Sequence, residues 1–211
     1  VKGDRATFKK NPNYWDKARQ PKFDKLVTIS FASQEAAVAQ ILTGKLDATT
    51  GISGATAAKI NKKKIDLVKV KSVAHLMVHM RSDFGPFSVD KRVRQAAALT
   101  LDRAGFLKGV LKGSGSLGND SVMDPFPTAD KSVKQRAKDL AAAKKLMAAA
   151  GSKGFKVDLS TYHRDDIDLL APFLKSSWAQ IGIDLNLGKI SDSYYTAPWD
   201  ANQAKKVENN Y

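Results

Sequence analysis

The feature of this sequence that most constrains its fold is the order strand, helix, strand, which occurs twice along the chain. In the first occurrence, residues 25–31 alternate and are rich in β-branched side chains, as is typical of a strand. Apolar residues then recur at helical spacing over 34–43, and Gly44 stands where a helix commonly ends in a left-handed conformation. Residues 46–50 are predicted to be extended again.

The second occurrence lies in the last third of the chain. A strand is predicted over 155–161, a helix over 169–181 and a further strand over 183–187, with Gly182 ending the helix. Strands that alternate with helices are typical of sheets covered by helices, so the predicted fold class is α/β. No fixed sequence period links the two occurrences, which argues against a solenoid.

Other helices are predicted from caps and apolar spacing. Ser88 is expected to cap a helix that runs to Asp102, and Asp102 to cap the next helix over 103–111. Asp139 is expected to cap an alanine-rich helix that Gly151 closes. The remaining predictions are a helix over 55–61, an irregular loop over 113–127, and strands over 65–70 and 75–80, the latter expected to be buried on both faces.

Composition excludes several classes of protein. The 211 residues include no cysteine, which rules out disulfides, thiolate zinc sites and cysteine nucleophiles. No stretch approaches the roughly 20 apolar residues that cross a bilayer. The net charge of +14 is compatible with nucleic-acid binding, but the densest basic run, residues 62–64, has no interleaved aromatics to stack on bases. A solvated basic surface is favoured, and a basic nucleic-acid-associated domain is the alternative.

Candidate catalytic and metal-binding groups are few. His163 precedes a group of aspartates over 165–168, but their spacing matches no metal-ligand pattern, and acids at the start of a helix favourably complement its dipole. Residues 113–118 are glycine-rich yet lack the Lys-Ser/Thr ending of a phosphate-binding loop. No Gly-x-Ser-x-Gly motif is present. The sequence therefore predicts no catalysis, no cofactor and no metal site.

Aromatic side chains stand near the ends of several predicted elements. Such residues pack in a core more often than they stack on a ligand. Trp15 and Trp178 are accordingly predicted to be core anchors. Tyr194, Tyr195 and Trp199 are left open between the two roles.

Five blocks of sequence follow one another in a distinctive order. They are Asn11-Pro-Asn-Tyr-Trp15 with Pro21; Leu42-Thr-Gly-Lys-Leu-Asp47; Gly85-Pro-Phe with Asp90-Lys-Arg-Val-Arg-Gln-Ala96 and Leu101-Asp-Arg103; residues 139–151; and Trp178-Ala-Gln-Ile-Gly-Ile-Asp184. This order resembles the extracellular solute-binding proteins of family 5, the oligopeptide, dipeptide and nickel binders that serve ABC transporters. The resemblance covers almost all of the chain but only the middle of the family's usual length.

The resemblance implies a fold like that of the type II periplasmic binding proteins, with two lobes joined by hinge strands and incomplete at both ends. Residues 1–74 would form part of lobe I, residues 75–81 the crossover hinge strand, and residues 82–211 most of lobe II. The implied function is the solute-binding component of an ABC importer, which captures a peptide or peptide-like solute between its lobes for delivery to the permease. The protein is expected to be a monomer, periplasmic or extracellular, without a cofactor and without a nucleic-acid partner.

Within such a fold, solute is expected to meet strand ends and the loops that follow them, where polar groups project beyond the sheet. Arg81 stands where family members often carry Asn, and its planar cationic fork suits a carboxylate or phosphate. The expected ligand-binding residues are Thr49, Thr50, Gly51 and Ile52 on one side of the cleft, and His79, Arg81, Tyr162, His163 and Arg164 on the other.

Overall fold

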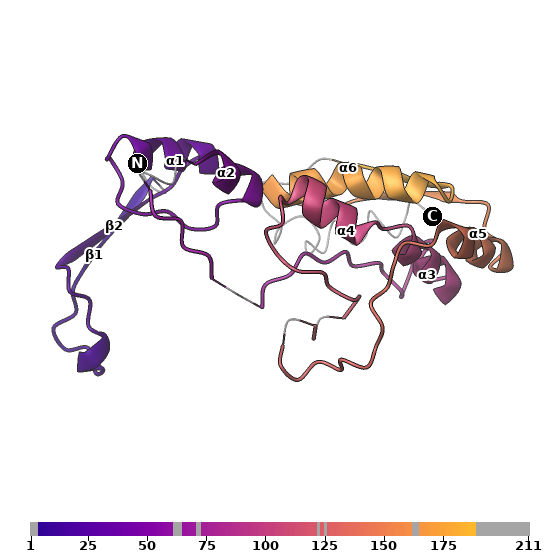
Figure 1. The fold of residues 1–211 in the computed structure, drawn as a ribbon, viewed down its shortest axis with the longest axis horizontal. Coiled ribbons are helices and arrows are strands. Elements are labelled where there is room, and N and C mark those ends of the chain that lie inside the picture. The colour runs from indigo at the N-terminus through magenta and orange to yellow at the C-terminus, as the bar shows by residue number, and fades with distance from the viewer. Residues whose placement is uncertain are drawn as a thin grey trace. The chain divides into compact units, whose positions relative to one another are not determined.

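The structure is a computed structural model that describes residues 4–60, 65–70, 73–121, 123–124, 126–161 and 165–188. Two compact units can be distinguished along the chain (Figure 1). The first consists of Val1–Ile52 and Thr56–Leu67, and the second of Ser53–Ala55 and Val68–Tyr211. The first unit ends at Leu67, ahead of the lobe boundary predicted at residue 74. The correspondence between these units and the two lobes stays a prediction.

Strands β1 (Arg5–Lys9) and β2 (Lys25–Ile29) form a two-stranded antiparallel sheet in the first unit, with Arg5 opposite Ile29. Only β2 is predicted from the sequence, because β1 carries a charged residue at each end and a single large apolar side chain. Almost every residue of the two strands is exposed. Within the described part of the chain, neither face of this sheet is therefore buried.

The connection between the two strands includes a short 3-10 helix, η1 (Lys17–Arg19). The Asp16 carboxylate caps it, accepting hydrogen bonds from the backbone N–H groups of the second and third helical residues at 3.1 and 3.3 Å. Trp15, next to this cap, is 80% exposed, and its ring lies 5.7 Å from that of Tyr14. The prediction that Trp15 is a core anchor is wrong, because it lies on a loop with no buried apolar layer beneath it among the described residues.

Helix α1 (Gln34–Leu42) confirms the helix predicted over 34–43. The Ser33 hydroxyl caps it by accepting a hydrogen bond from the N–H three residues on, at 3.2 Å. Ala37 and Val38 are buried on its inner face. The predicted stop at Gly44 is confirmed by its φ of 73°, a conformation that costs glycine little.

Helix α2 (Gly54–Lys59) agrees with the helix predicted over 55–61 as far as the chain is described. The hydroxyl of its Thr56 donates a hydrogen bond to Glu35 Oε1 of α1 at 3.1 Å. The extended pieces predicted at 46–50 and 65–70 do not form strands. A strand needs a hydrogen-bonded neighbour, and none of the described segments supplies a paired strand at these positions.

The segment 75–81 also forms no strand, but its side chains alternate as the sequence suggested. Leu76, Val78 and Met80 are half-buried, and Val78 and Met80 pack against the core of the second unit. The intervening side chains, including His79 and Arg81, are exposed. The expectation of burial on both faces is therefore wrong, because only one face of this segment meets apolar neighbours.

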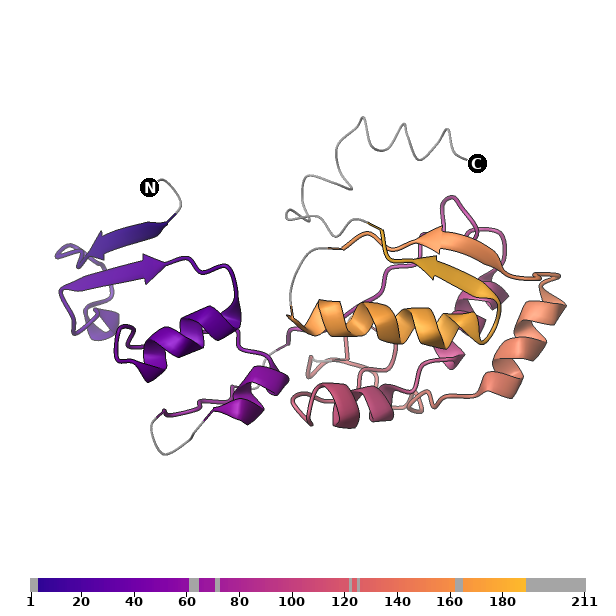
Figure 2. The same cartoon turned by 90° about the horizontal axis from the view of Figure 1, so that it is seen from above.

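Strands β3 (Phe155–Asp158) and β4 (Ile183–Asn186) pair in parallel in the second unit, joined by helix α6 (Asp165–Ala179). Figure 2 shows the two strands side by side with α6 alongside them. The second strand–helix–strand prediction is confirmed. Helix α6 begins at Asp165 instead of residue 169, so the predicted cluster of acids lies in its first turn, where the helix dipole favours carboxylates.

Helix α3 (Lys91–Leu99) begins two residues later than predicted. Asp90 caps it, its carboxylate accepting a hydrogen bond from the Arg92 N–H at 2.7 Å. The proposed cap, Ser88, instead donates its hydroxyl to the Gly85 carbonyl at 2.7 Å. The prediction is corrected because the chain still turns at 85–88, where Ser88 stabilises the turn and leaves the helix start to Asp90.

Asp102 caps the next helix as predicted, accepting a hydrogen bond from the Gly105 N–H at 2.8 Å. The helix is short as an α-helix, α4 (Arg103–Gly105), and continues as a π-helix, η2 (Phe106–Val110), whose wider turn is closed by a 3.1 Å bond from Leu111 N to Phe106 O. The ring of Phe106 is buried 4.7 Å from the ring of Phe173 in α6. The long irregular loop predicted to follow is confirmed.

Helix α5 (Leu140–Ala149) is capped by Asp139 and followed by Gly151 at a φ of 67°, both as predicted. It packs against α3 through alanines with no exposed surface, which let the two helices approach closely. The core continues to Trp178 of α6, confirmed as a core anchor, whose ring lies 5.4 Å from that of Phe87. Leu174, Ile183 and Leu185 complete the most deeply buried layer.

A side-chain cluster fixes the irregular loop between η2 and α5. The Asn119 amide donates to the carbonyls of Val133 and Lys134 at 3.1 and 3.0 Å and accepts from the Arg136 N–H at 2.7 Å. Asp120 pairs with Arg103 on one side and lies 2.5 Å from Arg136 Nε on the other. The loop is therefore folded back on itself at a defined place. None of the helices in the described ranges is long and apolar enough to span a bilayer.

Candidate functional site

The carboxyl ends of β3 and β4 lie at one edge of the sheet because the two strands are parallel. In open α/β sheets, ligands bind beyond this edge. At the end of the paired register, Asn186 Nδ2 donates a hydrogen bond to Asp158 Oδ1 at 2.7 Å, which ties the two strand ends together. The edge is thus a rigid base from which the following loops leave.

A small pocket of about 120 Å³ lies at this edge. It is lined by Leu159, Thr161, Asp168, Ala171, Pro172, Leu187 and Gly188. The wall is largely apolar, with one hydroxyl and one carboxylate. Since pockets for whole small ligands occupy roughly 300–1,000 Å³, this one is large enough for a single side chain or similar group.

Three of the predicted ligand-binding residues follow directly on this pocket. Thr161 is the last described residue before them, and α6 begins after them. Tyr162, His163 and Arg164 themselves lie outside the described residues. These residues were selected because they follow the end of a predicted strand, and the pocket lies at the end of that strand, β3. Their role stays a prediction.

His79 and Arg81 lie in the second unit, on the exposed side of the segment 75–81. Because residues two apart on an extended chain face the same way, the two side chains share this side with His75 and Met77. On the opposite side, Val78 and Met80 are held by the core. The core contacts therefore fix which side chains of this segment face outward.

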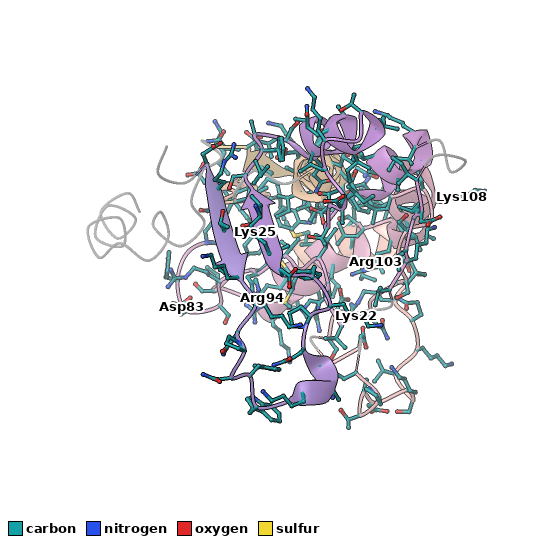
Figure 3. The ribbon with its side chains drawn as sticks, turned by 90° about the vertical axis from the view of Figure 1, so that its left-hand side faces the viewer. Lys22, Lys25, Asp83, Arg94, Arg103 and Lys108 are labelled. Carbon is teal, nitrogen blue, oxygen red and sulfur yellow. The ribbon has the colours of Figure 1, made fainter. Side chains whose placement is uncertain are left out.

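The guanidinium of Arg81 already has two partners. Its Nε donates to Asp83 Oδ1 at 3.0 Å, and its Nη2 donates to Asp83 Oδ2. The Arg81 carbon Cζ also lies 3.5 Å from the centre of the Phe84 ring, so the flat group stacks on an aromatic face. Figure 3 shows the side chains of this part of the molecule with Asp83 labelled.

The pair changes the ionisation of both groups. The hydrogen bonds from Arg81 lower the pKa of Asp83 from 3.8 to about 2, and the same contact raises the pKa of Arg81. At neutral pH the site is therefore a cation and an anion in contact. The sequence prediction included Arg81 but not its contacts Asp83 and Phe84, although an acid two residues after an arginine was a usable signal for the pair.

The other four predicted residues lie in the first unit, in the turn between α1 and α2. Thr49 and Ile52 are half-buried, and Thr50 and Gly51 are exposed. Gly51 has a φ of 72°, and its carbonyl accepts a hydrogen bond from the side-chain amide of Gln34 at the start of α1. The structure thus gathers these four residues in one tethered turn of the first unit and places His79 and Arg81 in the second.

A second hollow of about 280 Å³ lies in the first unit, beside the β1–β2 sheet. It is lined by Phe8, Lys9, Lys10, Asn11, Tyr14, Arg19, Pro21, Phe23, Asp24 and Leu26. Sequence reasoning did not select these residues as a site. Basic side chains gather on this hairpin, among them Lys22 and Lys25, which Figure 3 labels. Across the segments that the structure describes, no three acidic or histidine side chains gather as metal ligands.

Comparison with known proteins identifies the family. Residues 1–209 match the model of the bacterial extracellular solute-binding proteins, family 5 middle region. A curated relative, the dipeptide-binding protein of Pseudomonas aeruginosa strain PAO1, is 26% identical over 193 residues, which cover 83% of this chain and 34% of that protein. The chain therefore spans about a third of the length of this relative.

Solved structures show the same fold. NikZ from Campylobacter jejuni, in complex with Ni(L-His), aligns with a TM-score of 0.77 at 20% identity, covering 94% of this chain and 42% of that one. The periplasmic binding protein DppA from Helicobacter pylori, in complex with the peptide STSA, aligns with a TM-score of 0.71 at 23% identity, covering 87% and 36%. The chain belongs to family 5 of the bacterial extracellular solute-binding proteins, which are periplasmic or extracellular.

Proposed function

We propose that this chain is part of the solute-binding component of an ABC importer, which captures a peptide or peptide-like solute between two lobes and presents it to the permease. The observation that carries the proposal is the family match over residues 1–209, together with the curated dipeptide-binding relative. Members of this family are binding proteins, so the chain acts by non-covalent capture and not by catalysis.

The division of the chain into two units supports this mechanism. In the proposal, residues 1–74 are part of lobe I, residues 75–81 form the crossover between the lobes, and residues 82–211 are most of lobe II. Closure of two lobes replaces the water around a solute with polar groups from both walls. The turn 49–52 would contribute from one wall, and His79, Arg81 and Tyr162–Arg164 from the other.

Within this site, Arg81 is the residue best suited to a solute carboxylate. It lies on the exposed side of a segment whose other side is held in the core, and its guanidinium can bind a carboxylate through two parallel hydrogen bonds. The predicted solute class is therefore a peptide or similar molecule with a free carboxylate.

The test is titration of the chain with the peptide STSA, followed by calorimetry and by NMR of the residues in 75–84. We expect binding in the micromolar range or weaker, because the chain spans about a third of its relatives and many contacts that offset solute desolvation lie elsewhere. Arg81→Ala should weaken it roughly tenfold through loss of a charge-assisted hydrogen bond. Unchanged affinity in Arg81→Ala would remove Arg81 from the site, and the absence of binding even at about millimolar STSA would contradict peptide capture by this chain.

The net charge of +14 is compatible with one other candidate, a basic domain that associates with nucleic acid. The affinity of such a domain for random-sequence DNA falls steeply as salt rises, because binding releases condensed counterions. If the chain is a solute-binding protein, we expect only weak binding to DNA at physiological salt. A micromolar complex with a steep salt dependence would favour the nucleic-acid candidate.

A further inference from the structure

Two of the surfaces through which the Arg81 guanidinium can meet a partner are occupied. The Nε–Nη2 edge carries both hydrogen bonds to Asp83, at 3.0 Å for the Nε bond. One face of the group lies 3.5 Å from the centre of the Phe84 ring. Among the described residues, no hydrogen-bond acceptor contacts Nη1. The Nη1 end of the cation is therefore open to hydrogen bonding as far as the described residues are concerned.

A solute carboxylate can reach this cation in two ways. It can displace the Asp83 carboxylate from the Nε–Nη2 edge, or it can bind at the Nη1 end beside a carboxylate of the same sign. The first route requires competition with a group only two residues away, whose effective concentration is high. The second route brings two negative charges close together. Both routes lower the affinity for an anion.

Asp83 is ionised under the conditions in which a solute is captured. Its pKa is lowered to about 2, first by the hydrogen bonds from Arg81. The side chains of the pair are more than half exposed, at 60% for Arg81 and 63% for Asp83, so water and salt screen their attraction. The Arg81–Asp83 ion pair is thus weak enough for a solute carboxylate to displace Asp83.

We propose that Asp83 is a specificity-determining residue of the solute site, which competes with solute carboxylates for Arg81 and so lowers the affinity for anionic groups. This inference rests on the proposed function, because it assigns Arg81 to the solute. Asp83 joins Arg81 in the proposed solute site, where its charge lowers the affinity for carboxylates. Removal of the Asp83 charge should strengthen carboxylate binding, not weaken it.

The decisive variant is Asp83→Asn. Asparagine keeps the shape of the side chain and an acceptor for the Arg81 Nε–H, so the stack on Phe84 is retained while the competing charge is lost. Asp90→Asn is the matched control. Asp90 also pairs with an arginine two residues away, with a distance of 2.9 Å from Arg92 Nε to Asp90 Oδ2, and asparagine is as good a helix cap as aspartate. Both variants change the net charge equally.

The readout is the Arg81 Nε–Hε NMR signal during titration with N-acetylalanine, which carries a carboxylate, and with N-acetylalaninamide, which does not. We expect Asp83→Asn to bind N-acetylalanine roughly two- to fivefold more tightly than the unmodified chain, the range of an exposed ion pair. N-acetylalaninamide should show no such gain, and Asp90→Asn should behave like the unmodified chain.

Equal or weaker binding of N-acetylalanine by Asp83→Asn overturns the inference, because Asp83 would then orient Arg81 or have no effect on it. A gain of the same size in Asp90→Asn also overturns it, since net charge would explain the effect. A parallel titration with the peptide STSA separates the two proposals. If STSA fails to bind while Asp83→Asn still strengthens N-acetylalanine binding, peptide capture fails, and what stands is the competition between Asp83 and carboxylates for Arg81.

Discussion

At the scale of single residues, two arginine–aspartate pairs of the same spacing differ in whether the aspartate also caps a helix. Asp83 and Asp90 each bind an arginine two residues away, and the pKa of each is lowered to about 2, first by that arginine's hydrogen bonds. Asp90 also caps a helix, because the chain enters α3 at this point. Asp83 caps no helix among the described residues, and its pair with Arg81 lies on the exposed side of the chain.

These two carboxylates predict how stability depends on pH. Their pKa values in the folded chain, about 2, lie below the value of 3.8 for an unperturbed aspartate. The pairs therefore contribute fully above about pH 4, and the contribution is lost as the pH falls toward 2. We expect the urea midpoint of the second unit to fall over this window. The double variant Asp83→Asn and Asp90→Asn should show a shallower fall, and an identical pH profile would contradict the assignment.

Residue type alone does not predict burial in this chain. Trp178 is 3% exposed and Trp15 is 80% exposed, although both were expected in the core. Trp178 repeats the apolar spacing of α6, so the helix itself directs it inward. Trp15 stands on a loop without such periodicity, and its surroundings depend on contacts far away in the sequence. Asp83 was not selected for a related reason: its contact with Arg81 appears only once the Arg81 side chain is placed.

At the scale of elements, the parts predicted correctly are those whose cause is local. The caps Asp102 and Asp139 and the glycine stop at Gly151 each satisfy backbone groups within a few residues. The strands expected at 65–70 and 75–80 did not form, because a strand also needs a partner. The alternation at 75–81 was nevertheless meaningful, since it separates the core-facing side chains from Arg81.

The junction between α6 and β4 depends on two glycines that approach each other. Gly154 has a φ of 102° and Gly182 a φ of 83°, and a Cβ added to Gly154 would collide with the Gly182 carbonyl. Because Phe155 N donates to that carbonyl at 3.2 Å, the collision lies at the start of the β3–β4 pairing. The close approach of these two glycines therefore sets the register in which β3 pairs with β4. The pocket lies at the opposite end of the same two strands.

Gly154→Ala should consequently destabilise the second unit by about 2 kcal/mol or more, from left-handed strain together with the collision. The measurement is the free energy of unfolding in urea. Gly109→Ala serves as the control, because Gly109 has no positive φ and no atom within 4 Å of an added Cβ. A loss in Gly154→Ala no larger than that in Gly109→Ala would mean that the backbone relaxes at little cost.

At the scale of the whole molecule, the two units differ in how much apolar surface they bury. The second unit has a continuous core that joins α3, α5, α6 and both parallel strands. In the described part of the first unit, the buried residues are Ala37, Val38, Thr56 and Ile60, and its sheet is exposed. Since hydrophobic burial is the main stabilising contribution to folding, the two units should differ in stability.

We therefore expect the chain to unfold in two steps, the first unit before the second. Hydrogen exchange followed by mass spectrometry should show β1 and β2 exchanging much faster than β3, β4 and α6. Leu174→Ala, which removes a side chain that is 1% exposed, should lower the stability of the second unit by about 2–5 kcal/mol and leave exchange in the first unit unchanged. Val38→Ala should destabilise the other unit: it should speed hydrogen exchange in α1 and leave exchange in the second unit unchanged. If either substitution moves both units together, the chain folds as one cooperative body and the two-step expectation is wrong.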